Sequence, residues 1–305
     1  MYELPDVGEI VALALAEDLG VPAEHLRSAS AYGPRLLERD VTSSTVIDVD
    51  ARFRGTVVAR KDAVVAGLPL VAAVYDALSS AAKLFEPVEV FPLVAEGSRV
   101  VAGTPVLEIE GVAWAALAGE RTALDFLMLL SGIATETARW VEAAGPGLAV
   151  CDTRKTWPGM RVLSKYAVAI GGGTNHRFGL WDMALVKDNH IARAGGIAAA
   201  VASVRDIWPD LLVQVEAETL AQAEEAARCG ADLVLLDNMS DDLLAQAVLA
   251  VREIAESRDR AILTEASGTV AFERIANLRA TGVDRLSTSA ITLRANPIDF
   301  GLDEG

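Results

Sequence analysis

The sequence predicts an α/β protein in which a smaller N-terminal α+β domain precedes an incomplete parallel (β/α) barrel. In the second half of the chain, short apolar segments alternate with helical stretches, a pattern typical of parallel strands joined by crossover helices. In the first half, valine-rich segments are separated by glycine-containing turns, as in antiparallel hairpins. A length of 305 residues also matches about two domains.

The chain is expected to begin with an amphipathic helix over residues 6–19. Asp6 and Glu9 stand at the spacing of a capping box, and Gly20 provides a C-terminal stop. Residues 21–41 lack a strong period and contain two prolines, so an irregular excursion is expected there.

The β layer of the first domain is expected between Ala51 and Gly111. Its apolar runs are short and are split by glycine-containing pairs, as in an antiparallel sheet. A helix from about Pro69 to Phe85 is expected to pack on this layer, because proline is well tolerated in a first helical turn. These elements predict an open-faced sandwich over residues 1–123.

Six strand candidates then alternate with helical stretches within residues 124–293, and most of them end in a polar or charged residue. In a (β/α) barrel, the loops leaving the carboxyl ends of the strands converge over the active site. A doubly wound open sheet also binds ligands at strand ends. We favour the barrel because nearly every strand ends in a polar residue and because no G-x-G-x-x-G motif follows the first strand. Six strands fall short of eight, so we expect it to be incomplete. The candidates are residues 148–153, 184–187, 211–217, 233–238, 261–267 and 285–290.

Composition limits the partners and the compartment. The formal net charge of −16 argues against nucleic acid or an anionic membrane as a partner, since both bind basic surfaces. Residues 1–20 lack the basic start of a signal peptide, and no uninterrupted apolar run approaches the ~18 residues of a membrane span. Cys151 and Cys229 form neither a disulfide framework nor a metal-ligand spacing. We therefore expect a soluble, cytoplasmic protein in which any anionic ligand binds at a local departure from this acidic balance.

One segment departs from the acidic balance. Residues 152–193 hold seven Lys or Arg against three acids, a local charge of +4, and two of the three histidines. A solvated basic face is the simple explanation of such a cluster. Here the basic residues alternate with strand-like and glycine-rich segments, which favours a pocket for an anionic ligand.

Three stretches supply the cations of this pocket. Residues 152–156 end the first barrel strand and place a guanidinium, which can hold a carboxylate bidentately, beside a compact ammonium. Residues 171–177 form a glycine-rich turn that allows close backbone approach, although such a run also occurs in ordinary loops. Residues 185–190 end the second strand. Together they suit a ligand with two carboxylates, and the side chains concerned are Arg154, Lys155, His176, Arg177, Lys187 and His190.

Two carboxylates, Glu216 and Asp237, end the next pair of strands and should be neighbours. Such hard oxygen ligands suit Mg²⁺, which keeps several waters and is shared with substrate phosphates. The structural alternative is that they form ion pairs with Lys155 or Lys187. Their place at strand ends favours contact with a metal or a ribose.

Small hydroxyl and glycine residues follow the last two strands, at residues 265–269 and 287–290. Each group comes before a possible helix start. Barrels often bind phosphate in this way after late strands.

Several segments of the chain resemble those of a known enzyme family. Segments in this order and spacing resemble quinolinate phosphoribosyltransferase from about Glu120 to Asp303, with weaker similarity at residues 17–20, at residues 40–43 and in the β layer. DTRKT and GGGTNHR together are highly specific. The matching segments are ERTALDFLMLLSGIAT, DTRKTWPGMR, KYAVAIGGGTNHRFGL, ALVKDNHI, VQVEAETL, LLDN, EASG and GVDRLSTSAIT.

The resemblance implies transfer of a phosphoribosyl group from phosphoribosyl pyrophosphate to quinolinate with decarboxylation, giving nicotinate mononucleotide for NAD biosynthesis. It implies Mg²⁺ and a homodimer or larger homo-oligomer in which Arg121 reaches the pocket of a partner subunit. It also implies that the tail, residues 294–305, returns to the N-terminal domain.

The resemblance also implies roles for individual residues. Glu216 and Asp237 would lie near the ribose and Mg²⁺, and Lys155 or Lys187 would lie nearest the carbon that loses CO₂. Those that would surround quinolinate are Thr153, Arg154, Lys155, His176, Arg177 and Lys187. Those that would bind phosphate are Ser267, Gly268, Thr269, Ser289 and Ala290.

Two departures from the family pattern lie in the phosphate loops. Thr269 stands where the family usually has a second glycine, and residues 289–294 read SAITLR where it commonly reads GALTHS. A β-branched residue tolerates a positive φ poorly. Thr269 therefore indicates either a different turn or a position that does not require glycine, and the change bears on donor affinity and choice.

Two other functions remain open. One is a barrel aldolase in which a lysine forms a Schiff base. The other is a paralogue that acts on another aromatic acid, or that binds a phosphorylated metabolite without turnover, in a molybdenum-associated operon or specialised metabolism. The intact DTRKT and KDNH segments argue against lost activity.

Overall fold

The computed structural model describes residues 5–27 and 32–304, which form two compact units. Among these residues, no helix has both the length and the apolar character needed to cross a membrane. The first unit comprises Met1–Glu136, Val162–Gly171 and Ala295–Gly305, and the second comprises Thr137–Arg161 and Gly172–Arg294.

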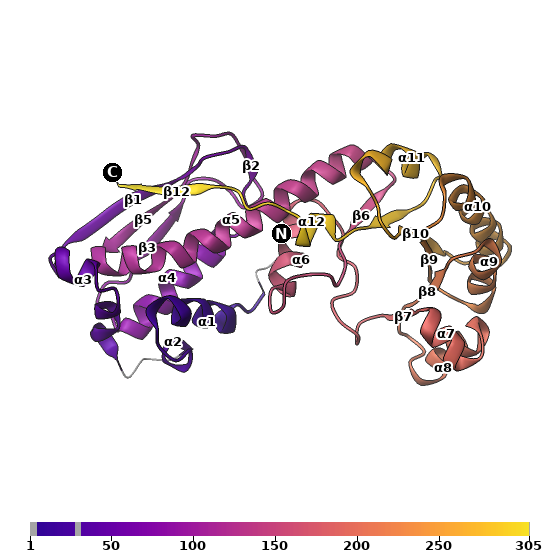
Figure 1. Ribbon diagram of the computed structural model, residues 1–305, viewed down its shortest axis with the longest axis horizontal. Helices are drawn as coiled ribbons and strands as arrows, with labels where there is room; N and C mark the ends of the chain where they lie inside the picture. The colour runs from indigo at the N-terminus through magenta and orange to yellow at the C-terminus, as the bar shows by residue number, and fades with distance from the viewer. Residues whose placement is uncertain (1–4, 28–31, 305) are drawn as a thin grey trace. The chain divides into compact units, whose positions relative to one another are not determined.

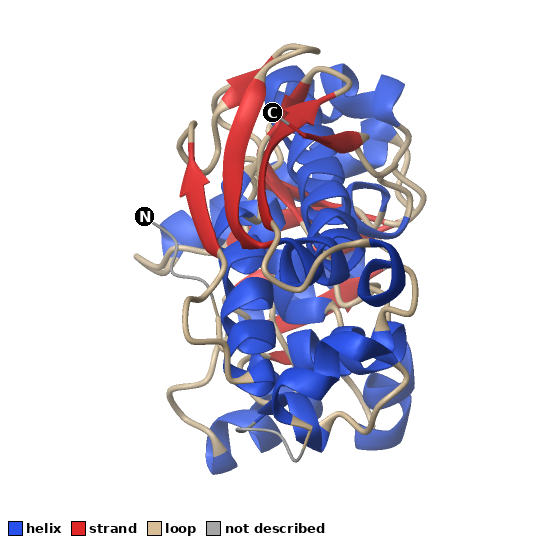
Figure 2. Ribbon diagram, turned by 90° about the vertical axis from the view of Figure 1, so that its left-hand side faces the viewer, coloured by secondary structure: helices blue, strands red, loops and turns tan. Residues whose placement is uncertain are grey.

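The first unit contains the predicted antiparallel layer. Its four strands lie in the order β12-β1-β5-β3, and every neighbouring pair is antiparallel. Helices lie along one side of this sheet (Figures 1 and 2), as in the expected open-faced sandwich. The strands are β1 (Arg52–Ala59), β3 (Glu89–Pro92), β5 (Pro105–Val112) and β12 (Phe300–Glu304), with a separate pair β2 (Ala63–Val64) and β4 (Arg99–Val100).

The C-terminal strand, β12, forms one edge of this sheet. β12 pairs with β1 in a register that sets Gly55 opposite Glu304 and Ala59 opposite Phe300. The C-terminal segment thus lies beside a strand that begins at Arg52, far earlier in the sequence. The expected limit of the N-terminal domain at residue 123 falls within α5 (Ala113–Ala144).

The helices of the first unit follow the predicted periodicity, with one correction. α1 (Gly8–Leu19) ends at Gly20, whose φ of 63° is left-handed as expected of a C-cap. The capping box predicted for Asp6 and Glu9 is wrong. Val7 occupies the N-cap position, and the Gly8 N–H donates to Asp6 Oδ1 at 3.0 Å instead.

The predicted helix after Gly67 is α4 (Leu68–Ala82), with proline in its first turn. The expected irregular excursion over residues 21–41 contains short helical turns, although residues 28–31 lie outside the described residues. Those turns are α2 (Glu24–Arg27) and η1 (Gly33–Arg39). The unit also contains α3 (Ser43–Val46) and all of α6 (Arg161–Ile170) except Arg161, which belongs to the second unit.

The second unit contains the predicted parallel sheet, in the order β6-β11-β10-β9-β8-β7. All five neighbouring pairs are parallel. β6 and β7 are consecutive in sequence yet occupy opposite edges, so the sheet does not close between them, which confirms an incomplete barrel. Thr174 forms a single parallel bridge beside β6, with Cys151. The strands are β6 (Ala149–Cys151), β7 (Ala184–Val186), β8 (Val213–Ala217), β9 (Leu233–Asp237), β10 (Leu263–Ser267) and β11 (Arg285–Ser287).

Helices connect these strands and lie along the outer side of the sheet (Figure 1). β9 is an unbroken run of buried apolar residues from Leu233 to Leu236, as expected of a parallel strand covered on both faces. The connecting elements of this unit are α7 (Asp188–Ala194), α8 (Ile197–Ile207), α9 (Leu220–Cys229), α10 (Asp241–Ser257), η2 (Phe272–Arg274) and α11 (Ile275–Ala280), and α12 (Ala290–Leu293) follows the last strand, β11.

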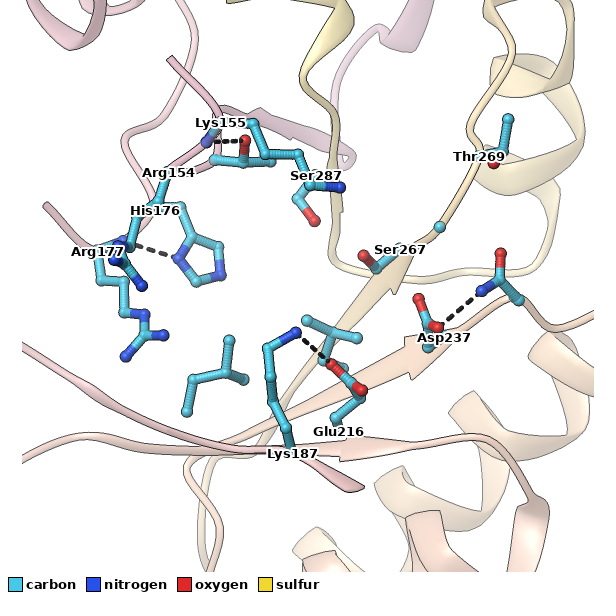
Figure 3. A pocket seen from close by; sticks show the side chains of 15 residues that line it. Arg154, Lys155, His176, Arg177, Lys187, Glu216, Asp237, Ser267, Thr269 and Ser287 are labelled. Carbon is cyan, nitrogen blue, oxygen red and sulfur yellow. Dashed lines mark hydrogen bonds and ion pairs between the residues drawn. The ribbon is translucent and has the colours of Figure 1, made fainter. Parts of the chain in front are cut away.

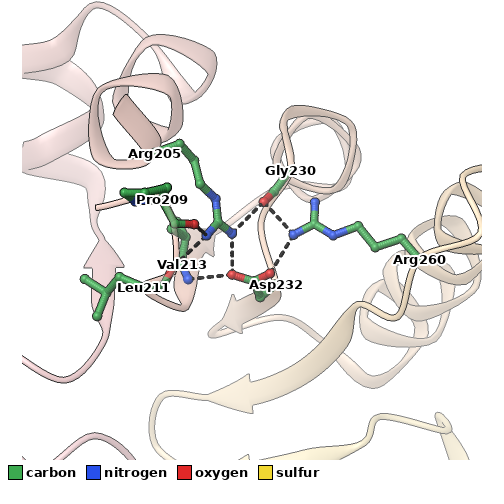
Figure 4. A network of polar contacts seen from close by, with 7 residues as sticks. All are labelled: Arg205, Pro209, Leu211, Val213, Gly230, Asp232 and Arg260. Atoms are coloured by element: carbon green, nitrogen blue, oxygen red, sulfur yellow. Dashed lines mark hydrogen bonds and ion pairs between the residues drawn. The ribbon is translucent and has the colours of Figure 1, made fainter. Parts of the chain in front are cut away.

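A polar network secures the amino ends of β8 and β9 (Figure 4). Asp232, just before β9, accepts the Val213 N–H at 2.7 Å and a guanidinium N–H of Arg260 at 2.6 Å, and it also pairs with Arg205. Both guanidinium groups also donate to the Gly230 carbonyl, at 3.2 and 2.9 Å. Burial raises the pKa of Asp232, but the donated hydrogen bonds outweigh it and hold the pKa below its ordinary value.

We expect Asp232→Asn to lower the free energy of unfolding by about 2 kcal/mol at neutral pH, because charge-assisted hydrogen bonds are lost. Because the pKa of Asp232 is lowered in the folded protein, its contribution to stability is fully present at pH values above the pKa of unfolded aspartate, about 3.9. This stabilisation is lost as the pH falls through the folded value. Urea denaturation over a pH series should show the two proteins converging in strong acid.

Asp206→Asn is the matched control, because Asp206 is exposed on α8. Equal unfolding free energies for all three proteins at neutral pH would contradict the role given to the network.

Candidate active site

A cavity of about 620 Å³ opens at the carboxyl ends of the parallel strands in the second unit. The strand register explains its floor. Glu216 on β8 is the in-register partner of Leu235 on β9. Asp237, two residues further along β9, is the partner of Ser267 on β10. The lining residues are Thr153, Arg154, Lys155, His176, Arg177, Leu185, Lys187, Glu216, Leu235, Asp237, Asn238, Ser267, Gly268, Thr269 and Ser287.

The cavity gathers most of the residues predicted from the sequence. Every residue expected around the acceptor, both carboxylates and the first phosphate loop line it, whereas Ser289 and Ala290 of the second loop do not. Arg121 belongs to the first unit, where it pairs with Asp125 one turn along α5 at 3.3 Å. His190 caps α7, since its Nδ1 accepts the Lys187 N–H at 3.0 Å.

Figure 3 shows Arg154, His176 and Arg177 on one side of the cavity. A guanidinium N–H of Arg177 donates to the Met183 carbonyl at 3.0 Å. Burial and the nearby Arg154 charge lower the pKa of Arg177 from its ordinary value. Two guanidinium groups held close together make this side strongly attractive to a carboxylate-bearing ligand.

The DTRKT segment is held by local hydrogen bonds. The Lys155 N–H donates to Thr153 Oγ1 at 2.9 Å, and the Lys155 carbonyl accepts from Thr292 Oγ1 at 2.9 Å. Thr292 is buried in α12. Residues 289–294, where the sequence departs from the family pattern, therefore include a side chain that supports the backbone of Lys155 in the cavity.

The opposite side carries the carboxylates. Lys187 Nζ lies 3.0 Å from Glu216 Oε2, and Asp237 Oδ2 accepts from Asn238 Nδ2 at 2.7 Å (Figure 3). The ion-pair alternative from the sequence is thus realised for Glu216, with Lys187 as its partner. Asp237 contacts an amide.

Among residues 5–27 and 32–304, no group of three or more His, Cys, Asp or Glu side chains could together hold a metal ion. Two carboxylates over an open cavity still fit Mg²⁺, which takes its remaining ligands from water and substrate phosphates. Glu216 and Asp237 are the side chains that would hold it.

The loop after β10 explains one departure from the family pattern. Gly268 has a φ of 109°, whereas Thr269 has no positive φ. The position that requires glycine is therefore kept, and threonine occupies one that does not. The neighbouring Asn238, with a φ of 52°, donates its N–H to the Ser267 carbonyl at 3.2 Å.

Sequence reasoning missed several residues of the site. Asp152 is fully buried and binds the glycine-rich turn, accepting the His176 N–H at 2.9 Å and Asn175 Nδ2 at 2.7 Å. Leu185 and Leu235 line the cavity but have the pattern of ordinary core positions. The available signal for Asp152 was an acidic residue at the end of an apolar strand.

Comparison with known proteins identifies one family over most of the chain. The quinolinate phosphoribosyl transferase N-terminal domain matches residues 40–131, and the C-terminal domain of the same family matches residues 133–303. A nicotinate-nucleotide pyrophosphorylase [carboxylating] of Mycobacterium leprae is 37% identical over 265 residues, covering 87% of this chain and 90% of that protein.

Solved structures agree with these sequence matches. NadC from Streptococcus pyogenes superimposes with a TM-score of 0.85 at 33% identity, covering 99% of this chain and 98% of that one. The nicotinate-nucleotide pyrophosphorylase of Francisella tularensis gives a TM-score of 0.83 at 31% identity, with coverage of 99% and 98%.

Gly268→Ala should destabilise the protein by about 2–4 kcal/mol, because a left-handed conformation and a steric clash both oppose the side chain. A Cβ at this position would lie 2.1 Å from Asn238 Oδ1. Gly147→Ala is the control, since Gly147 also has a positive φ, of 91°, but nothing lies within 4 Å of its added Cβ. Denaturant unfolding should show a larger loss for Gly268→Ala. Equal losses would mean that the loop yields to the added methyl group.

Proposed function

The chain belongs to the quinolinate phosphoribosyltransferase family, and we propose that it transfers phosphoribosyl from phosphoribosyl pyrophosphate to quinolinate with decarboxylation. The products are nicotinate mononucleotide, pyrophosphate and CO₂. One observation carries the proposal: cations from the first two barrel strands and carboxylates from the next two line a single cavity.

The cationic side fits the acceptor. Quinolinate carries two adjacent carboxylates on a flat ring, and Arg154 and Arg177 offer guanidinium groups that bind such groups bidentately. Leu185 and Leu235 supply apolar surface in the same cavity. The acceptor would thus be held with its pyridine nitrogen toward the donor.

The acidic side fits the donor. As the pyridine nitrogen bonds to the anomeric carbon, the bond to pyrophosphate breaks and the leaving group takes the electron pair. Glu216 and Asp237 would stabilise the positive charge that develops on the ribose. When bound, Mg²⁺ would neutralise charge on the pyrophosphate. Ser267, Gly268 and Thr269 would receive phosphate, supported by their place in the lining.

Decarboxylation would follow from the new pyridinium charge. The bond from the ring carbon beside the nitrogen to its carboxylate breaks, CO₂ leaves, and the electron pair stays on that carbon until it takes up a proton. Lys155 and Lys187 are the ammonium groups of the lining. Either can stabilise negative charge near this carbon.

We also propose a cytoplasmic homodimer in which Arg121 of one subunit completes the pocket of the other. The exposed Arg121 side chain, 61% accessible in this chain, supports a role in a partner's site. The free cysteines support a reducing compartment.

The direct test is incubation with quinolinate, phosphoribosyl pyrophosphate and Mg²⁺, following CO₂ and nicotinate mononucleotide. Nicotinate is the comparison acceptor, and phthalate should act as a competitive ligand that cannot form the product. Chelation by EDTA should abolish turnover, and added Mg²⁺ should restore it. No product with quinolinate, or turnover with another acid instead, would contradict the proposal.

Lys155→Ala and Lys187→Ala should each lower turnover at least ~100-fold, as expected when a charge partner of the transition state is removed. Lys61→Ala is the control, because Lys61 is exposed in the first unit. The measurement is the steady-state turnover rate of each variant with quinolinate and phosphoribosyl pyrophosphate. Near-normal turnover in both cavity variants would remove lysine from the mechanism.

Arg121→Ala and Lys187→Ala should each be nearly inactive, yet co-expression of the two chains should recover activity. A mixed dimer with a shared pocket holds one doubly altered site and one intact site. The purified mixed dimer should therefore retain about half the wild-type activity. A mixed dimer as inactive as its parents would show that Arg121 acts within its own subunit.

A further inference from the structure

Both ring nitrogens of His176 face protein groups. Nδ1 accepts the N–H of Arg177 at 2.8 Å, and Nε2 lies 3.4 Å from Glu265 Oε1. A nitrogen that accepts a hydrogen bond carries no proton, so the ring proton of the neutral imidazole belongs on Nε2, facing the carboxylate. The His176 side chain is only 7% exposed.

Glu265 lies beside this ring, with Oε1 as the carboxylate oxygen that faces it. It lies on β10 with a fully buried side chain, and its Oε2 accepts from Gln214 Nε2 at 3.0 Å. Arg285 lies 3.9 Å from the same oxygen. Burial raises the pKa of Glu265, but the contacts from His176, Ser287 and Gln214 outweigh it and lower the pKa, which favours the carboxylate.

The register gives Glu265 this position. It is the in-register partner of Leu235 on β9 and of Arg285 on β11, one step of the pleat below Ser267. Leu235 and Ser267 line the cavity, but Glu265 is not among the lining residues. It can therefore act only through its neighbours.

We propose that Glu265 is a positioning residue that, through the Nε2-protonated tautomer of His176, fixes the backbone of Arg177 for binding an acceptor carboxylate. With the proton on Nδ1, two N–H groups would face each other and the Arg177 backbone would shift. Asp152 holds the His176 N–H on the other side. The role of Arg177 in binding the acceptor rests on the proposed function, whereas the tautomer does not.

The tautomer can be read directly in the unaltered protein without substrate. The chain has three histidines, so ¹⁵N-histidine labelling gives a simple ring spectrum, assigned with His25→Gln and His176→Gln. We expect His176 to show an unprotonated Nδ1 and a protonated Nε2. A protonated Nδ1 would overturn the inference, and this result is independent of which acid the enzyme uses.

Kinetics of two variants then test the consequence. Glu265→Met removes the acceptor oxygen, and the KM for quinolinate should rise about tenfold while kcat and the donor KM change less than about threefold. Glu265→Gln keeps an acceptor oxygen and should stay within about threefold of wild type in all three constants. The control is Glu253→Met, because Glu253 is exposed on α10.

A purely structural role predicts different results. It would lower the free energy of unfolding in Glu265→Met without a selective change in the acceptor KM. An unchanged quinolinate KM, or equal loss in both KM values and kcat, would overturn the proposal. If Glu265→Met does not fold, the spectrum of the unaltered protein still decides the tautomer.

Discussion

The site depends on one constraint, the in-register pairing of parallel strands. Because β8, β9 and β10 run in the same direction, their carboxyl ends lie together and side chains two residues apart share a face. Glu216 and Asp237 come to the same cavity for this reason, and Lys187 at the end of β7 reaches Glu216 at 3.0 Å. A one-residue slip of β8 would turn its carboxylate away.

The two ends of these strands do different work. At the amino ends, Asp232 forms ion pairs with two arginines, and these groups also form hydrogen bonds to the neighbouring backbone. At the carboxyl ends, cations and acids line an open cavity, where their charge can act on a bound ligand. The buried Asp152 accepts hydrogen bonds from the glycine-rich turn that carries His176 and Arg177.

Much of the site could be predicted because its chemistry is local in sequence. DTRKT, the glycine-rich turn and the strand-end carboxylates each reveal a function by residue type and spacing. For Asp152 the sequence gives only an acid at the end of an apolar strand, and for Glu265 it does not indicate the partners of the side chain, because those partners lie far away in the chain. The capping box was wrong for a related reason: the spacing of Asp6 and Glu9 permits the hydrogen bonds of a capping box, but Asp6 Oδ1 accepts the Gly8 N–H instead.

The sequence by itself determined the alternation of strands and helices, the polar residues at strand ends and the family. These follow from periodicity and from motifs that are continuous along the chain. Only the tertiary structure decided that the barrel stays open between β6 and β7, that Lys187 pairs with Glu216 and that Thr269 needs no positive φ. Strand order, ion pairing and loop conformation each depend on contacts between residues far apart in the chain. A local sequence pattern does not show which of these residues come together in space.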